Sequence, residues 1–327
     1  MSHKKWTAEE VNKIVRLRRG GYSWKDIQRN MGGSKENIRA VFRRFVGAKT
    51  SSYTEKEKAI ERSELYHLHP DEMPKIAVLD IETLPMIKYA WQLFDNYSSI
   101  EEVIEDSCML SWAGKLLNGE EIKSDILTPE EAITRNTERI TKSVWEFLRG
   151  CDAVIGHNYV NFDSRYINTE FLKWGLNPLK YKIIDTFLIA KQNLRFSSNK
   201  MKFINDRLGI RNKLDHEGFP LWKRCSEGDP EALKDMLAYN EGDIGATEEL
   251  FYKLRPYVKN VNIALYATHR EAEMCPICGS VEWEIEKLDT TPAGLWEIVR
   301  CQSCGSLTRR KQNLLSTVKR KSLHVNY

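Results

Sequence analysis

The stretch Ile76-Ala77-Val78-Leu79-Asp80-Ile81-Glu82-Thr83 combines a run of apolar residues with two carboxylates. Five of its first six residues are apolar, which is typical of a buried β-strand. Alternate side chains of a strand share one face, so Asp80 and Glu82 should point the same way. Two adjacent carboxylates repel each other and resist removal from water, and a divalent cation relieves both costs. The stretch therefore predicts a metal site, the alternative being a strand end that turns into solvent.

The residues after this strand alternate between strand and helix patterns as far as about position 260. Strands are predicted over 109–117, 122–127, 153–156 and 183–184. Helices are predicted over 138–148, 162–174, 185–193, 202–208 and 230–254. This order predicts an α/β domain with a mixed sheet flanked by helices over residues 74–260.

Two further polar groups lie on these elements. The first is His157-Asn158-Tyr159-Val160-Asn161-Phe162-Asp163, directly after a predicted strand. The second is Tyr239-Asn240-Glu241-Gly242-Asp243 on the last long helix, where Tyr239 and Asp243 are four residues apart and share a face. Asp185 is interpreted as a helix N-cap rather than a ligand.

The order Asp-x-Glu, Asn-x-x-x-Phe-Asp and Tyr-x-x-x-Asp resembles the DEDD superfamily of 3′–5′ exonucleases. The tyrosine resembles the DEDDy branch, which includes DnaQ-like enzymes and polymerase proofreading domains. Residues 184–186, 201–209 and 221–240 also look like predicted exonucleases related to family B proofreading domains. The resemblance covers residues 74–254 and implies a ribonuclease H-like fold.

The resemblance also implies two Mg²⁺ or Mn²⁺ ions, which prefer oxygen ligands. The implied ligands are Asp80, Glu82, Asp163 and Asp243. Glu82 and Tyr239 would act in catalysis, with Tyr239 orienting the attacking water. His157, Asn158 and Phe162 are predicted to contact substrate, and the alternative for His157 is a core histidine hydrogen-bonded to the backbone.

The first fifty residues are strongly basic, with 13 Lys and Arg against 4 Asp and Glu. Three short helices are predicted over 7–46, beginning with a capping box at Thr7 and Glu10, and their pattern resembles helix-turn-helix DNA-binding domains. Residues that the third helix would offer to bases and phosphates are Lys35, Asn37, Arg39, Arg43 and Arg44. A protein-docking module with a basic face is the alternative. Residues 1–50 thus form one predicted domain, and 51–73 a linker.

Two Cys-x-x-Cys-Gly turns near the C-terminus are separated by 22 residues. Their thiols belong to Cys275, Cys278, Cys301 and Cys304. Four thiolates suit one structural Zn²⁺ in a tetrahedral site, and the strand-like residues between the turns resemble a zinc ribbon over 268–310. Redox chemistry is the alternative. A basic tail, 311–327, follows without a single acidic residue. Nucleic-acid contact by the ribbon and a purely structural role both remain open.

Bulk properties indicate a globular protein, with 41% hydrophobic and 29% charged residues. No apolar run approaches the ~20 residues that span a bilayer, and the N-terminus carries no apolar signal region. Seven cysteines, four of them in Cys-x-x-Cys pairs, favour a reducing compartment. We therefore expect a cytoplasmic protein without a membrane partner, in a prokaryotic cell or a phage-infected host.

The sequence as a whole predicts a metal-dependent 3′–5′ exonuclease that acts on DNA, with single-stranded 3′ ends as the expected substrate. Alternatives are an RNA 3′–5′ exonuclease, a structure-specific DNA endonuclease and a catalytically silent nucleic-acid-binding regulator. Duplex DNA is an expected partner of the helix-turn-helix. The length leaves no room for a polymerase domain. We therefore expect the chain either to work alone, in repair, recombination or degradation, or to serve a polymerase or a repair or recombination protein in trans.

Overall fold

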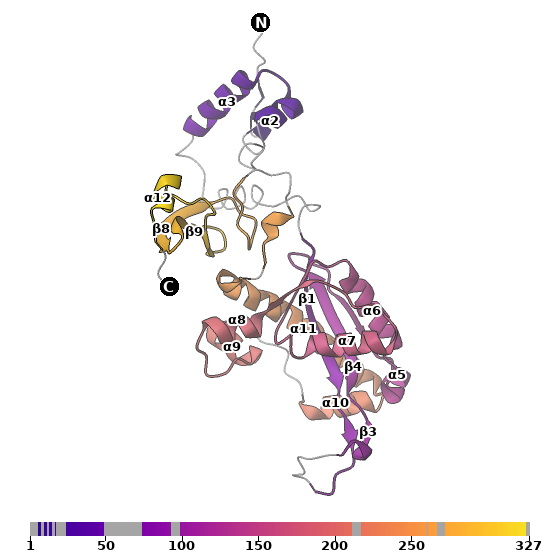
Figure 1. Cartoon of the computed structure of the whole chain (residues 1–327). Coiled ribbons are helices and arrows are strands. Elements are labelled where there is room, and N and C mark those ends of the chain that lie inside the picture. The colour runs from indigo at the N-terminus through magenta and orange to yellow at the C-terminus, as the bar shows by residue number, and fades with distance from the viewer. Residues whose placement is uncertain are drawn as a thin grey trace. The chain divides into compact units, whose positions relative to one another are not determined.

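The computed structural model describes residues 24–48, 74–92, 99–210, 217–259, 261–266 and 272–324, and seven positions between Trp6 and Leu17. The chain divides into two compact units, one formed by Pro74–Asn260 and the other by Met1–Met73 with Val261–Tyr327. Figure 1 shows the elements of both. The predicted linker over 51–73 lies outside the described residues.

A five-stranded mixed sheet forms the centre of the Pro74–Asn260 unit, with the strand order β5-β4-β1-β6-β7. The central strand β1 pairs antiparallel with β4 and parallel with β6. The outer pairs are β4 with β5, antiparallel, and β6 with β7, parallel. The bounds are β1 (Ile76–Leu84), β4 (Cys108–Leu116), β5 (Lys123–Ile126), β6 (Ala153–Gly156) and β7 (Lys182–Asp185). The predicted mixed sheet is therefore confirmed.

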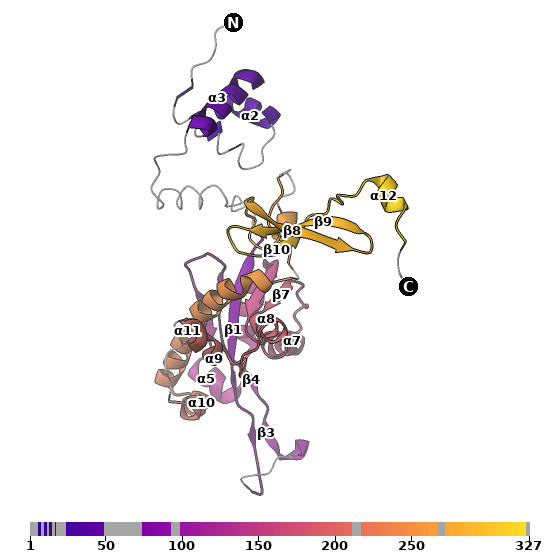
Figure 2. The same cartoon turned by 90° about the vertical axis from the view of Figure 1, so that its left-hand side faces the viewer.

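Each face of this sheet is covered by helices (Figures 1 and 2). Neighbouring residues of β4 point to opposite faces, and they reach different helices. Ser111 hydrogen-bonds to Asn240 of α11, whereas the Trp112 indole donates to Ser143 of α6. The helices are α5 (Pro129–Thr134), α6 (Glu138–Arg149), α7 (Asp163–Lys173), α8 (Thr186–Asn193), α9 (Met201–Leu208), α10 (Phe219–Ser226) and α11 (Pro230–Leu254).

The β1–β4 pairing decides which face the two carboxylates of β1 occupy. Glu82 pairs with Ser111 and Asp80 with Ala113, and paired residues of antiparallel strands share a face. Asp80 and Glu82 therefore lie on the face covered by α11. The alternate residues Leu79 and Ile81 are buried in the main core together with Trp112.

A β-bulge interrupts this pairing directly after Glu82. Glu82 pairs with Ser111 while Thr83 pairs with Met109, so Leu110 is the additional residue on β4. Bulges bend a strand and increase its twist, and they are over-represented next to active sites. The bulged strand is therefore β4, and its distortion lies opposite the end of β1 that carries Glu82.

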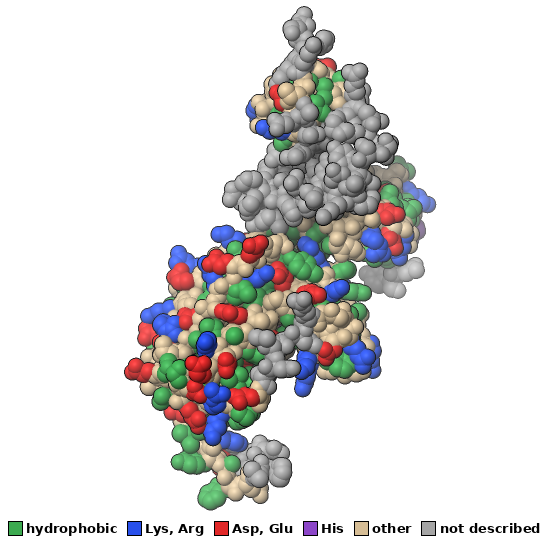
Figure 3. All heavy atoms as spheres, turned by 180° about the vertical axis from the view of Figure 1, so that it is seen from behind, with side chains coloured by type: hydrophobic (Ala, Val, Ile, Leu, Met, Phe, Trp, Pro, Cys, Tyr) green, Lys and Arg blue, Asp and Glu red, His purple; other side chains and the backbone are tan. Residues whose placement is uncertain are grey.

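A two-stranded hairpin, β2 (Ile87–Lys88) with β3 (Val103–Glu105), projects between β1 and β4 (Figure 2). It was not predicted from the sequence. Several of its apolar side chains are exposed, Trp91 and Ile100 to 91% each. Apolar groups are visible at this end of the unit in Figure 3, whereas acidic and basic side chains intermix over the rest of that face.

Helices α5 and α10 were also not predicted, although the N-terminus of α5 has a recognisable sequence signal. Thr128 and Glu131 form a reciprocal capping box around Pro129 at the first helical position. Thr-Pro-x-Glu is a recognised sequence signal for a helix N-terminus.

The N-terminal residues that the structure describes pack as predicted for short amphipathic helices. Helices α2 (Trp24–Met31) and α3 (Lys35–Ala48) bury Ile27 and Ile38 against Ile14. The capping box predicted at Thr7 and Glu10 is present, with both hydrogen bonds formed. DNA binding by these helices stays a prediction.

The C-terminal region contains a three-stranded antiparallel sheet in the order β10-β9-β8. Its strands are β8 (Trp283–Thr291), β9 (Gly294–Cys301) and β10 (Leu307–Arg309), followed by the short helix α12 (Thr317–Lys321). The two strands predicted between the cysteine pairs correspond to β8 and β9. Among the described helices of the whole chain, none has the length and apolar character to cross a membrane.

We expect Gly156→Ala to destabilise the Pro74–Asn260 unit by about 1–3 kcal/mol, because overpacking forces buried neighbours to shift. An added Cβ would lie 2.8 Å from Cδ2 of Tyr159, a fully buried ring whose hydroxyl hydrogen-bonds to Tyr181. Urea unfolding would measure the change. Gly245→Ala is the control, since its Cβ meets no atom within 4 Å and alanine should stabilise α11 by up to about 1 kcal/mol.

Candidate active site and cysteine cluster

Three carboxylates meet between the end of β1 and the middle of α11. One oxygen from each of Asp80, Glu82 and Asp243 lies within 4.8 Å of the others. Asp80 and Glu82 are half-buried, and Asp243 is fully buried. Like charges this close disfavour one another, and burial adds a desolvation cost. Oxygen-only ligand sets of this kind suit Mg²⁺ or Mn²⁺, so the donor chemistry fits the expected cations.

Helix α11 brings Asp243 to the sheet. Asp229 caps the helix by accepting hydrogen bonds from the backbone N–H groups of Glu231 and Ala232, and Pro230 occupies the first turn. The helix has 25 residues, and those facing the sheet are buried. Tyr239 and Asp243 lie on this buried side, as the spacing of four predicted.

Asp163 approaches the same strand from α7. It is buried at the first position of this helix, and its Oδ1 accepts a hydrogen bond of 3.1 Å from the backbone N–H of Ile81. Ile81 lies between Asp80 and Glu82 in the chain, so Asp163 is fixed beside both. The group of three mutually close carboxylates does not include Asp163. The structure thus brings three of the four predicted ligands together. The fourth, Asp163, is hydrogen-bonded to β1, the strand that carries Asp80 and Glu82.

Tyr239 is buried one helical turn before Asp243. Its ring contacts the edge of the Trp222 ring from α10, with centroids 6.2 Å apart and planes at 74°. Such edge-to-face packing is a favoured arrangement of aromatic rings and holds the Tyr239 ring beside α10.

The loop that carries His157 and Asn158 is held by Asp185. The Asp185 carboxylate accepts hydrogen bonds of 3.0 Å each from the backbone N–H groups of Asn158 and Val160. It also caps α8 by accepting from Phe187 and Leu188, so the predicted N-cap is confirmed. Asn158 adopts a left-handed backbone with φ of 63°, a conformation that asparagine tolerates better than most residues.

The three predicted substrate contacts have different surroundings. His157 uses both ring nitrogens within the protein, at 2.9 Å from Thr186 Oγ1 and 2.9 Å from the Asn199 carbonyl. This arrangement favours the alternative of a core histidine. Asn158 is half-buried, whereas Phe162 is exposed and packs against Tyr166 at 5.0 Å. Phe162 therefore has the accessible surface that a base contact requires.

Two polar residues beside the carboxylates were not predicted. Asn240 donates to Asp80 at 2.8 Å and accepts from Ser111 at 3.0 Å. The sequence carried a signal for Asn240, because a position three residues before Asp243 shares its helix face. Ser111 had no such signal, since its place depends on the register of β1 against β4.

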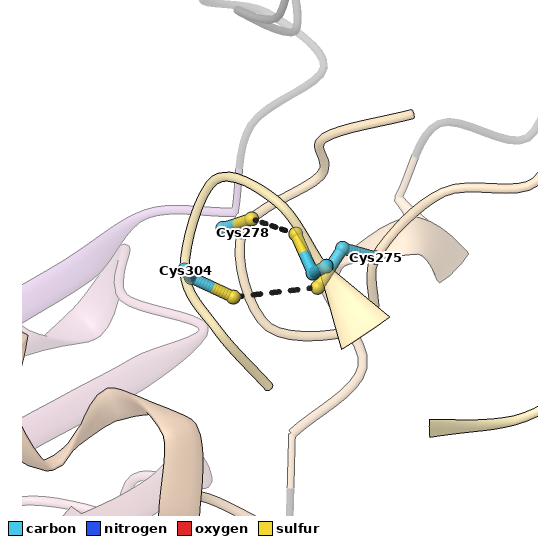
Figure 4. Close-up of side chains that lie close together, drawn as sticks. Cys275, Cys278 and Cys304 are labelled. Carbon is cyan, nitrogen blue, oxygen red and sulfur yellow. Dashed lines mark hydrogen bonds between the residues drawn. The ribbon is translucent and has the colours of Figure 1, made fainter. Parts of the chain in front are cut away.

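The four paired cysteines converge in the C-terminal region (Figure 4). Cys275 Sγ lies 3.6 Å from Cys304 Sγ, and Cys278 Sγ lies 3.6 Å from Cys301 Sγ. These contacts are too long for disulfides, whose sulfurs are about 2 Å apart, and all four cysteines are free. Tetrahedral Zn²⁺ with Zn–S bonds of about 2.3 Å separates its sulfurs by about 3.8 Å. The geometry therefore fits one metal ion held by four thiolates.

Both cysteine turns have the same backbone. The N–H of Gly279 donates to the Cys275 carbonyl, and the N–H of Gly305 donates to the Cys301 carbonyl, at 2.9 Å in each case. The φ angles of the two glycines are 76° and 74°, which other residues rarely adopt. Hydrogen bonding to the Cys275 thiol raises the pKa of Cys278 and lowers that of Cys301 to about 6. Thiolates are the metal-binding form.

The remaining three cysteines have thiols of low reactivity. Burial raises the pKa of Cys108 to about 11, of Cys151 to about 11 and of Cys225 to about 12. Such thiols stay protonated at neutral pH and are poor nucleophiles.

We compared the chain with models of known protein families and with known proteins. Residues 117–255 match the family model of the RNase H superfamily. The chain contains an RNase H-like domain. The matched region of the RNase H-like domain includes Asp163, Tyr239 and Asp243, whereas β1 precedes it.

Two curated relatives are DNA polymerases III of PolC type. The protein from Ureaplasma parvum is 29% identical over 140 residues, covering 38% of this chain and 9% of the relative. The protein from Mycoplasma genitalium is 28% identical over 182 residues, covering 50% of this chain and 11% of the relative. The chain therefore spans about a tenth of the length of these relatives. A family B DNA polymerase from Pyrobaculum calidifontis is 14% identical, with a TM-score of 0.42 over 67% of this chain and 31% of that one.

We expect Asp185→Asn to loosen the loop before Asp163, because an amide keeps only one acceptor and turns a donor toward a backbone N–H. A lost hydrogen bond to a charged group costs about 1.5–3 kcal/mol, measurable by urea unfolding. Hydrogen exchange should accelerate at the N–H groups of Asn158 and Val160.

Asp229→Asn is the matched control, since Asp229 caps α11 and pairs with Arg224 of α10, and neither helix belongs to this loop. Its exchange at residues 157–163 should equal that of the unchanged protein. Equal exchange in both variants would contradict the role assigned to Asp185.

Proposed function

We propose that the RNase H-like domain is a metal-dependent 3′–5′ exonuclease that hydrolyses phosphodiester bonds of DNA. The observation that carries this proposal is the convergence of Asp80, Glu82 and Asp243 within 4.8 Å. Uncompensated carboxylates at this spacing are unfavourable, and a divalent cation offsets their repulsion. The family match and the PolC-type relatives support nuclease chemistry on the same residues.

The residues that would hold two Mg²⁺ or Mn²⁺ ions are Asp80, Glu82, Asp163 and Asp243. Asp80, Glu82 and Asp243 already lie close to one another. Asp163 is held beside them by the hydrogen bond that its Oδ1 accepts from the Ile81 backbone N–H. Bound ions would lower the pKa of a water and neutralise charge on the phosphate.

The protein's own groups position the reactants. Tyr239 lies one turn from Asp243 and packs against Trp222, and we assign its hydroxyl the role of orienting the attacking water. Glu82 lies on β1 next to the bulge of β4 and can accept a hydrogen bond from that water. Exposed Phe162 offers a ring on which the terminal base can stack.

DNA is the proposed substrate because the curated relatives are DNA polymerases by name. The carboxylates lie near the end of β1. The 3′ end of a DNA strand would have to reach them, and a free single-stranded end suits this. RNA exonuclease activity, structure-specific endonuclease activity and binding without catalysis are the competing functions.

The two terminal regions are proposed to deliver nucleic acid in the cytoplasm. In α3 the Arg39 guanidinium lies 5.5 Å above the Trp24 ring, and Lys35 and Asn37 are half-buried. The side chains of Arg43 and Arg44 lie outside the described residues. A polymerase or a repair or recombination protein is the proposed partner in trans.

We propose that the four cysteines hold one structural Zn²⁺. All four ligand positions come from the protein, which leaves no open position for catalysis. Arg309 stacks on Trp296 at 4.7 Å, and Arg310 pairs with Glu297 and Glu273, so these two cations stabilise the ribbon. Exposed Lys311, Lys319, Arg320 and Lys321 follow the ribbon and are proposed for phosphate contact.

The exonuclease proposal predicts that the protein with Mn²⁺ shortens a 5′-labelled single-stranded DNA stepwise from its 3′ end. Asp80→Asn and Asp243→Asn should each lower the rate at least ~100-fold, because metal-based charge stabilisation is worth several kcal/mol. Asp235→Asn is the control, an exposed carboxylate on α11. Activity that survives both site variants would contradict the assignment.

Three substrates in the same assay distinguish the competing functions. Faster loss of an RNA strand of equal sequence would favour the RNA exonuclease. Cutting of a circular single strand would indicate an endonuclease. Binding without any cleavage would leave the regulatory alternative.

The zinc proposal predicts one Zn²⁺ per chain, measured by atomic emission. Cys301→Ser should reduce this to near zero and unfold the C-terminal sheet, since the metal supplies much of the folding free energy of such small domains. Cys151→Ser is the control and should keep the metal. Unchanged zinc content in Cys301→Ser would contradict the proposed ligand set.

A further inference from the structure

Asn240 and Ser111 form a buried polar connection behind Asp80. The Asn240 Nδ2 group donates to Asp80 Oδ2 at 2.8 Å, and the Ser111 hydroxyl donates to Asn240 Oδ1 at 3.0 Å. Both Asn240 and Ser111 are completely buried. Asparagine is a weak helix former and a costly residue to bury, so its place in the middle of α11 requires a reason.

The two hydrogen bonds fix the direction of the Asn240 amide. A carboxylate accepts only, so the amide nitrogen has to face Asp80. The opposite orientation would place the amide oxygen against the carboxylate, and in the observed one the Ser111 hydroxyl donates to the amide oxygen. Asn240 therefore holds Oδ2 of Asp80 in a fixed direction beside Glu82 and Asp243.

Three different elements meet in this connection. Asp80 belongs to β1, Asn240 to α11 and Ser111 to β4, where Ser111 is the last regularly paired residue before the bulge. Asn240 also precedes Asp243 by three residues, so the same helix turn sets both a carboxylate and the donor that orients its neighbour.

We propose that Asn240, held by Ser111, is a positioning residue that orients the Asp80 carboxylate for cation binding. The proposal rests on the exonuclease site described above. Partners that orient a ligand from behind raise metal affinity, and their removal typically costs 10–100-fold. The neutral amide achieves this without adding a fourth negative charge to the three carboxylates.

The test measures Mn²⁺ binding to the full chain by calorimetry, in the absence of substrate. Asn240→Leu should weaken binding at least ~10-fold, because Asp80 loses the hydrogen bond from the Asn240 amide. Ser111→Ala should weaken binding by a smaller factor, about 3-fold, since the amide keeps its contact but loses the group that fixes it. In the nuclease assay, excess Mn²⁺ should restore the rate of Asn240→Leu and not that of Asp80→Asn.

Matched controls separate positioning from general damage to the fold. Asn205→Leu replaces a buried asparagine of α9, and Thr247→Val removes a buried hydroxyl of α11 that contacts Met201. Both should bind Mn²⁺ like the unchanged protein. If Asn240→Leu does not fold, the Ser111→Ala affinity and its rescue by Mn²⁺ decide the question.

The outcomes also separate this proposal from the exonuclease proposal. Unchanged Mn²⁺ affinity in Ser111→Ala and Asn240→Leu, in a protein that binds Mn²⁺ and degrades DNA, would overturn the positioning role alone. A protein that binds no Mn²⁺ at the carboxylates would overturn both proposals. Loss of affinity in the two variants, with unaffected controls, would support the positioning role.

Discussion

The mutual repulsion of three carboxylates is the constraint on which the RNase H-like domain depends. Asp80, Glu82 and Asp243 are held within 4.8 Å of one another at a partly desolvated position. Such an arrangement persists only when rigid elements over-determine it. The central strand of a five-stranded sheet and a 25-residue helix supply that rigidity. The bulge at Glu82 and the cap at Asp229 then adjust where the strand bends and where the helix starts.

Much of this site could be predicted from the sequence, because its residues follow the periodicity of single strands and helices. A two-residue repeat places Asp80 and Glu82 on one face, and a four-residue repeat does the same for Tyr239 and Asp243. Asp185 was interpretable as a cap because it precedes a helix. Features that depend on the pairing of residues far apart in the chain could not be predicted. The Ser111 contact follows from the β1–β4 pairing, and the Asp163 hydrogen bond to Ile81 joins residues 82 positions apart.

The side chains suited to metal binding form two sets, which belong to separate units. Carboxylate oxygens gather in the Pro74–Asn260 unit, and the four paired thiols belong to the C-terminal region. Hard cations prefer oxygen and zinc prefers sulfur, so each ligand set discriminates against the other's ion. The lone cysteines of the RNase H-like domain are buried or half-buried with raised pKa values, and they do not compete for soft metals.

The hairpin between β1 and β4 has a consequence for how the domain can vary. Its two ends are anchored by the same strand pair that orients Asp80 and Glu82, so its length does not enter their geometry. Residues can be inserted or exchanged at its tip while Glu82 still faces Ser111. A single residue added to β4 between Ser111 and Gly114 would instead turn the following side chains to the opposite face. Within a few residues along the chain, the domain thus has both its most adaptable segment and its least adaptable one.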